Sequence, residues 1–102
     1  MHLVQILLPL YDNRGNRLVK SLFAQVRDEL VTRYGGLTAH ARAPASGLWQ
    51  EDGGETVHDD LVIYEVMVDA LDEDWWNRYR LQLQARFRQD ELVIRAHPIT
   101  RL

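Results

Sequence analysis

The stretch MHLVQILLPLY, residues 1–11, decides the fold, because it is apolar at nearly every position and is interrupted by Gln5. Such a run is typical of a strand in the middle of a sheet, covered on both faces. The stretch LVIYEVMVD, residues 61–69, is also a strand by composition, and Glu65 is the one charge in its middle. We therefore predict two central strands, one from each stretch.

Two further elements are predicted between these strands. Apolar residues recur at spacings of three and four from Leu18 to Tyr34, which is typical of an amphipathic helix, and Gly35-Gly36 ends it. Residues 37–43 alternate between apolar and polar side chains, which predicts a strand with one small-residue apolar face. Gly53-Gly54 then predicts a hairpin turn that leads back to the second central strand.

The C-terminal third is predicted to contain a second helix and a last strand. Asp72 occupies the expected N-cap position, and Glu73 and Asp74 lie where the helix dipole favours negative charge. The last strand is expected from Leu92 to about Ile99. The buried stripe of this helix is predicted to be Trp76, Tyr79, Leu83 and Phe87. Its solvated surface is predicted to hold Arg78, Arg80, Gln82, Arg86 and Arg88.

The order strand, helix, strand, strand, helix, strand predicts an α+β fold of the ferredoxin-like, split βαβ (βαββαβ) kind. Right-handed crossovers place the first and third strands in the middle of a four-stranded antiparallel sheet, with two helices on one face. These are the two strands that composition marks as central. A chain of 102 residues has room for one hydrophobic core, so residues 1–102 are predicted to form a single ferredoxin-like domain.

Composition argues against several classes of function. Twelve Lys and Arg against fifteen Asp and Glu give a net charge of −3, and phosphate binding needs a positive surplus, so no nucleic-acid partner is expected. The lack of cysteine excludes disulfides, thiolate metal sites and cysteine nucleophiles. There is no apolar run of about eighteen residues, and the N-terminal run lacks the basic flank of a signal peptide, so we expect no membrane partner and a cytoplasmic location.

The sheet face away from the helices is predicted to be apolar. Because side chains alternate along a strand, the even positions of residues 1–11 face the helices, and Leu3, Leu7, Ile63 and Met67 lie on the opposite face. A monomer rarely exposes a large contiguous apolar patch, and a second copy across a two-fold axis is the simplest cover. We therefore predict a homodimer through this helix-free face.

The chain also resembles known proteins. The likeness rests on Leu8-Pro9-Leu10-Tyr11, on Gly47-Leu48-Trp49 with Gly53-Gly54, and on RFRQDELVI at residues 86–94. Together these segments look like a family of small uncharacterised bacterial proteins with a ferredoxin-like fold, and the likeness covers most of the chain. The predicted pairing of two sheets resembles the dimeric α+β barrel superfamily, whose members enclose a cavity. That superfamily includes monooxygenases, haem-handling enzymes and regulatory ligand-binding modules, so the likeness transfers no active-site residue.

Polar residues interrupt the helix-free face and form the candidate ligand-binding site. The cluster comprises Gln5, His40, Arg42, Glu65, Arg95 and His97. A two-residue turn at the glycine pair puts Arg42 opposite Glu65. The same register puts His40 opposite Met67. Either these groups form ion pairs and hydrogen bonds at a dimer interface, or Arg95 with one or both histidines stays unpaired and binds a small anion such as a carboxylate.

Other chemistry has less support in the sequence. The segment from Glu51 to Asp60 has metal-ligand residue types but matches no coordination spacing, so we expect a solvated hairpin tip and no metal site. No serine lies in a nucleophile elbow and no glycine-rich loop matches a phosphate or dinucleotide fingerprint, so no cofactor is expected. Trp75 and Trp76 form either an aromatic wall for a ligand or a packing contact with the adjacent helix or a partner subunit.

Two functions stay open, from different classes. In the first, the protein is a binding or assembly module without catalysis of its own, and the dimeric sheet face is mainly an interface. In the second, it is a dimeric α+β barrel enzyme that acts on a small organic substrate, including an anionic one, in a cavity at the sheet face, with His40 or His97 as acid or base. A water-filled cavity between the sheets favours the enzyme, and a dry, packed interface favours the module.

Overall fold

The computed structural model describes residues 1–41 and 61–102, and these residues form six elements in the predicted order. They are β1 (His2–Pro9), α1 (Lys20–Tyr34), β2 (Thr38–Ala41), β3 (Leu61–Val68), α2 (Glu73–Arg86) and β4 (Ile94–Pro98). The predictions for Arg42, for the Gly53-Gly54 turn and for the acidic segment 51–60 lie outside the described residues. None of the described helices is long and apolar enough to cross a membrane.

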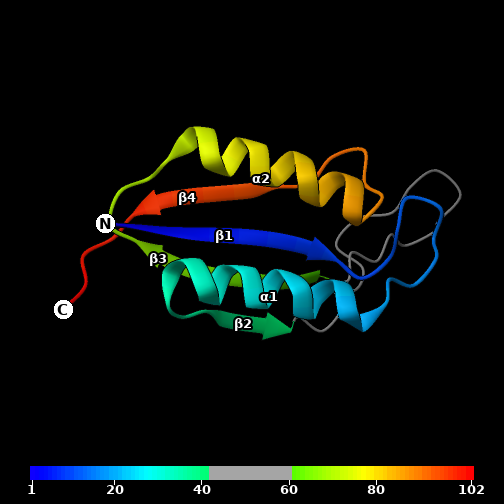
Figure 1. Ribbon diagram of the computed structural model, residues 1–102, viewed down its shortest axis with the longest axis horizontal. Helices are drawn as coiled ribbons and strands as arrows, with labels where there is room; N and C mark the ends of the chain where they lie inside the picture. The colour runs from blue at the N-terminus through cyan, green and yellow to red at the C-terminus, as the bar shows by residue number, and fades with distance from the viewer. Residues whose placement is uncertain (42–60) are drawn as a thin grey trace, which may run out of the picture.

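The central strands are β1 and β3, as predicted. The sheet has the order β2-β3-β1-β4, and all its pairings are antiparallel. Both helices cover the same face of the sheet and lie side by side along it, with β1 visible between them (Figure 1). The arrangement confirms the predicted ferredoxin-like α+β fold.

Alternation along β1 separates the two faces of the sheet. Val4, Ile6 and Leu8 are buried beneath the helices, whereas Gln5 and Leu7 lie on the opposite face and are partly exposed. The pleat of a strand sends successive side chains to opposite faces, so this result follows from the sequence pattern. The same rule holds for β3, whose even-numbered residues contribute to the core.

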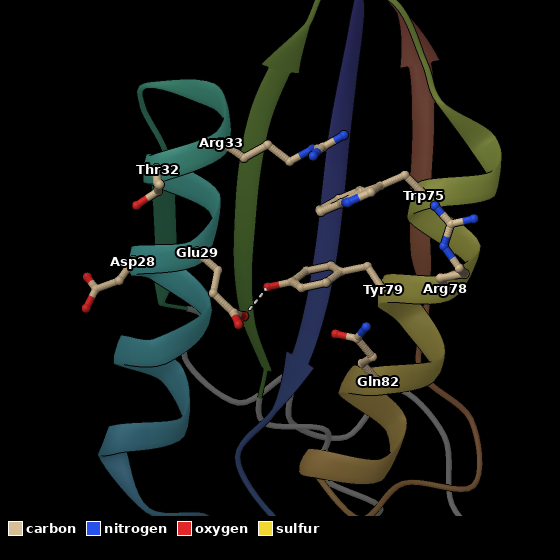
Figure 2. Close-up of a pocket in the computed structure, with 8 residues that line it drawn as sticks. All are labelled: Asp28, Glu29, Thr32, Arg33, Trp75, Arg78, Tyr79 and Gln82. Carbon is tan, nitrogen blue, oxygen red and sulfur yellow. Dashed lines mark hydrogen bonds between the residues drawn. The ribbon is translucent and has the colours of Figure 1, made fainter.

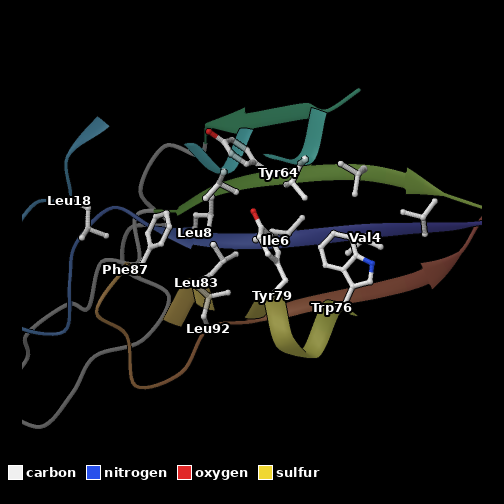
Figure 3. Close-up of a cluster of buried hydrophobic side chains, with 14 residues drawn as sticks. Val4, Ile6, Leu8, Leu18, Tyr64, Trp76, Tyr79, Leu83, Phe87 and Leu92 are labelled. Carbon is white, nitrogen blue, oxygen red and sulfur yellow. The ribbon is translucent and has the colours of Figure 1, made fainter. Parts of the chain in front are cut away.

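The core lies between the helices and the sheet (Figure 3). The predicted stripe of α2 is buried at all four positions, from Trp76 to Phe87. The Phe87 ring meets the Phe23 ring edge to face, with centroids 5.2 Å apart. The Tyr64 hydroxyl donates a hydrogen bond of 3.2 Å to the carbonyl of Phe23, which joins β3 to α1. The core therefore connects both helices to the central strands.

The helix boundaries have local causes. The Asp72 side chain accepts a hydrogen bond from the Trp75 amide, so α2 begins at its predicted cap. Gly35 adopts a left-handed conformation with φ of 82° and ends α1 as predicted. At its other end α1 starts later than Leu18, because the Leu18 amide donates to the carbonyl of Leu10 instead of joining the helix.

The pairing of β2 with β3 corrects the predicted register. Thr38 lies opposite Glu65, in the position predicted for Arg42, so the register differs by four residues. The prediction assumed a two-residue turn with no net slip between the strands, and turn length is what sets the register of a hairpin. A slip by an even number of residues leaves each side chain on its predicted face.

The two residues that follow Thr38 show the result of this slip. His40 lies opposite Ile63 rather than Met67, but it remains on the helix-free face. Ala39 lies opposite Tyr64, on the face that carries the helices, as predicted. It is nevertheless exposed, because β2 forms one edge of the sheet.

We predict that Phe87→Ala destabilises the fold by about 3 to 5 kcal/mol, because a fully buried aromatic ring is removed and a cavity is left. The control is Leu81→Ala on the same helix, where the side chain is 56% exposed and the expected change is within about 0.5 kcal/mol. Denaturant unfolding of both variants measures the difference. Equal effects would contradict the assignment of the buried stripe.

Candidate functional site

The helix-free face of the sheet presents apolar side chains that no described element covers. Met67 is 51% exposed and Val93 is 45% exposed. Leu3 lies opposite Met67 and Leu7 lies opposite Ile63, so β1 and β3 carry two apolar cross-strand pairs on this face. The pairs differ in exposure, because Ile63 is buried and only 8% exposed. The Leu7 amide donates to the carbonyl of Val93, which places Val93 at the end of the second pair. The predicted apolar surface is therefore present in part, with Met67 and Val93 exposed, Leu3 and Leu7 partly exposed and Ile63 buried.

Between the two apolar pairs, four side chains form a hydrogen-bonded chain across all four strands. Arg95 on β4 donates from Nε to Oε1 of Gln5 on β1, at 2.8 Å. Gln5 donates from Nε2 to Oε2 of Glu65 on β3, at 2.7 Å. Nε2 of His40 on β2 lies 2.6 Å from Oε1 of the same carboxylate. We call Arg95, Gln5, Glu65 and His40 the polar chain.

Glu65 is the negative group of the polar chain. The hydrogen bond from Gln5 lowers its pKa below the ordinary value of 4.5, partial burial opposes this, and the hydrogen bond and charge of His40 and the charge of His97 lower it further. A carboxylate with a lowered pKa stabilises the fold above its unfolded pKa, and this contribution is lost as the pH falls through the folded value. Glu65 therefore carries its charge at neutral pH.

Four of the six predicted site residues come together in the polar chain. His97 is exposed on the same face, opposite Leu3, and is not hydrogen-bonded to a side chain of the described residues. Arg42 lies outside the described residues. Of the two alternatives for Arg95, its Nε follows the paired one, because it donates a hydrogen bond to Gln5. Its two terminal nitrogens have no hydrogen-bond partner among residues 1–41 and 61–102.

A second feature is an open groove of about 670 Å³ between α1 and α2. Figure 2 shows Trp75 and Tyr79 projecting from α2 toward α1, where Arg33 lies over the indole. The Trp75 and Tyr79 rings are stacked with centroids 4.8 Å apart, and the Arg33 guanidinium lies 4.1 Å from the centroid of the Trp75 ring. Of the two alternatives for Trp75, the structure shows packing against the adjacent helix, where Tyr34 also contacts it.

The polar groups in this groove join the two helices. Glu29 on α1 accepts two hydrogen bonds from Arg86 on α2, at 2.6 and 2.9 Å, and one from the Tyr79 hydroxyl at 2.9 Å. Arg86 lowers the pKa of Glu29, and burial followed by Glu29 raises that of Tyr79. The prediction that Arg86 is only solvated surface is therefore wrong. We call Glu29, Tyr79 and Arg86 the helix brace.

The sequence contains a signal for this brace that the apolar stripe of α2 does not include. Tyr79 and Arg86 are seven residues apart, which is two helical turns, so both side chains lie on one face of α2. A polar residue that shares a face with a buried tyrosine is placed to reach the neighbouring helix. Glu29 lies next to the buried Leu30 on α1 and offered no comparable spacing.

We predict that Arg86→Ala destabilises the fold by about 1 to 2 kcal/mol, since it removes two charge-assisted hydrogen bonds that are partly exposed to water. Arg78→Ala is the control, because this arginine is exposed on the same helix, and its expected effect is below about 0.5 kcal/mol. Thermal or denaturant unfolding measures both. Indistinguishable variants would show that the brace contributes nothing to stability.

No family model matches the chain, and no curated protein matches it in sequence. Solved structures do match. The divalent cation tolerance protein Cut A1 of Thermus thermophilus is 16% identical with a TM-score of 0.59, over 99% of this chain and 86% of the other. A phage SAM lyase in complex with S-methyl-5'-thioadenosine is 13% identical with a TM-score of 0.60, over 94% of this chain and 79% of the other. At these identities the likeness establishes the ferredoxin-like fold and nothing finer.

Proposed function

We propose that the protein is an assembly module without catalysis of its own, and that it associates with a second copy through the helix-free face. The observation that carries this proposal is the apolar surface on either side of the polar chain, where Met67 and Val93 are about half exposed although Ile63 is buried. Burying apolar surface is favourable by roughly 25 cal/mol per Å². A two-fold axis brings the same patch of each copy together, so one apolar face suffices to build the interface.

The polar chain is compatible with burial in such an interface. A buried polar group is costly when it lacks a partner, and the groups of the polar chain already bond one another, except for the terminal nitrogens of Arg95. His40, one of the two histidines considered as acid or base, contacts the Glu65 carboxylate through Nε2. These bonds support an interface more directly than they support an acid–base site.

The similar structures do not select a chemistry for this chain. One is named for divalent cation tolerance, and the other is a lyase with a bound nucleoside. One fold carrying such different names illustrates that function depends on the site rather than on the fold. Among residues 1–41 and 61–102, no group of three or more histidines and carboxylates is placed to hold a metal ion.

We predict that the unmodified protein sediments as a dimer at micromolar concentration and that Met67→Lys shifts it toward the monomer, because a charge is placed in the apolar interface. The matched control is Leu81→Lys, at a side chain that is 56% exposed on α2 and lies away from the helix-free face. Analytical ultracentrifugation compares the three proteins. A monomeric unmodified protein, or equal effects of the two lysines, would overturn the proposal.

A second candidate function is binding of a small anion at Arg95, with the cluster Gln5, His40, Arg42, Glu65, Arg95 and His97 as its surroundings. One observation favours it. Arg95 uses only Nε within the polar chain, and residues 1–41 and 61–102 offer its terminal nitrogens no hydrogen bond. A guanidinium fork matches the two oxygens of a carboxylate. An enzyme that acts on an anionic substrate would bind that substrate at the same site.

We predict for this candidate that acetate or phosphate perturbs the NMR signals of Arg95 and its neighbours in a saturable titration, and that Arg95→Ala abolishes the effect. Arg78→Ala, which changes an exposed arginine on α2, leaves the titration unchanged. An unmodified protein that shows no saturable shift at Arg95 would exclude the anion site. Such a result would leave the assembly function untouched, since that function does not require a ligand.

A further inference from the structure

We propose that the two copies pack with their two-fold axis parallel to the strands, so that Arg95 of each copy pairs with the partner's Glu65. This inference rests on the proposed self-association and goes further, because it assigns the orientation of the partner and the residues that select it. The observations that carry it are the direction of the polar chain and its position between two apolar pairs.

The polar chain has a positive end and a negative end. Arg95 supplies a permanent positive charge on the edge strand β4, and the Glu65 carboxylate lies on β3, two strands away. At the usual strand spacing the two charges are separated by about 10 Å across the sheet. The terminal nitrogens of Arg95 have no partner among the described residues. Glu65 accepts two hydrogen bonds, whereas a carboxylate offers about four acceptor positions.

Packing two sheets face to face by a two-fold rotation requires an axis that lies in the plane between them. An axis parallel to the strands reverses the order of strands but keeps each residue at its height along the strand. Leu3 then lies over the partner's Met67, and Leu7 lies over the partner's Ile63, because these are cross-strand neighbours at equal heights. Apolar pairs meet apolar pairs, with more exposed area at Met67 than at the buried Ile63, and the polar chain meets the partner's polar chain.

Under the same rotation the ends of the two polar chains are exchanged. β4 lies over the partner's β2, so the partner's β3, with its carboxylate, is displaced by only one strand spacing, about 4.8 Å. An arginine side chain can cross this displacement. Aligned sheets pack with their strands at about −30° to each other. The displacement that this rotation causes is smallest near the centre of the sheet, and Gln5 places the polar chain near the middle of the central strand β1.

A two-fold axis perpendicular to the strands gives a poorer match of charges between the two copies, wherever along the strands the axis passes. Such an axis keeps the order of strands and reverses their direction. If it passes through the polar chain, Arg95 lies over the partner's Arg95 and Glu65 lies over the partner's Glu65, which places like charges together. If it passes elsewhere, the polar chain is buried against apolar side chains, and the charge of Arg95 is left without a partner. Charge complementarity therefore favours the parallel axis.

The first test asks whether removing the charge of Arg95 weakens or tightens the dimer. Arg95→Gln keeps a donor for Gln5 but removes the positive charge, so it should raise the dissociation constant of the dimer at least about tenfold, or about 1.4 kcal/mol. Arg78→Gln, with the same change on exposed α2, should leave the constant unchanged. If arginine lies over arginine, Arg95→Gln tightens the dimer instead, and this result would overturn the proposal.

The second test uses the lack of native cysteine in the chain. With the parallel axis, Val93 on one copy lies over the partner's His40, because both flank the pair of Leu7 with Ile63 at the same height. Differently tagged Val93→Cys and His40→Cys proteins are mixed and treated with a bismaleimide too short to span the sheet, which is about 14 Å wide. We expect cross-links between the two variants and few within either one.

The outcomes separate this proposal from the one on which it rests. If the unmodified protein is a monomer in the ultracentrifuge, both proposals fail. If it is a dimer in which each cysteine variant cross-links to itself, the axis is perpendicular to the strands near the level of Leu7, and only the orientation is wrong. A dimer that forms no cross-link in either mixture overturns the parallel axis, and if Met67→Lys also leaves that dimer intact, the interface lies on another face and both proposals fail.

Discussion

The alternation of side chains along β1 is the constraint on which the rest of the structure depends. β1 is hydrogen-bonded to β3 on one side and to β4 on the other. Its pleat therefore determines which side chains of both neighbouring strands face the helices. A slip of one residue would expose Val4, Ile6 and Leu8 and bury Gln5 in the core, which makes the register costly to change. Both helices therefore pack on the face that carries Val4, Ile6 and Leu8. The same alternation determines which residues lie on the opposite face.

The helix layer needs a constraint of its own, because α1 and α2 lie over the sheet with an open groove between them. The helix brace provides it by joining Glu29 to Tyr79 and Arg86 across this groove. Apolar packing on the sheet is tolerant of small lateral shifts, whereas a bidentate arginine–carboxylate pair has a narrow geometry. The brace thus fixes the spacing of the helices, and its polar atoms are occupied by one another rather than open to a ligand.

The fold could be predicted from the sequence wherever one strong local pattern decided an element. The apolar run of residues 1–11, the cap at Asp72 and the glycine at position 35 each specify their structure without reference to distant residues. The register of β2 could not be predicted, because it depends on the connection between β2 and β3 rather than on either strand. The prediction that Arg86 is solvated is wrong for a related reason, since a charge on a helix surface is solvated only if no neighbouring helix offers a partner.

The sequence predicts which residues of the candidate site share a face of the sheet, but not which of them are hydrogen-bonded to one another. Strand alternation alone placed Gln5, Glu65 and Arg95 on one face, and the structure bonds them in sequence across the sheet. Hydrogen bonding depends on rotamers and on cross-strand distances that a sequence does not contain. His40 shows this most clearly, because it lies opposite Ile63 and yet reaches diagonally to Glu65.

A polar chain in the middle of an apolar face has a physical consequence for any partner. A uniformly apolar face would bury nearly the same area in many orientations, so it would associate without a defined geometry. A buried charge without a partner destabilises a complex by several kcal/mol, so the charges of Arg95 and Glu65 penalise orientations that leave them unmatched. In the free protein, Gln5 links these two charges by hydrogen bonds to Glu65 and Arg95. We infer that the apolar pairs supply the attraction on this face and that the polar chain supplies its selectivity.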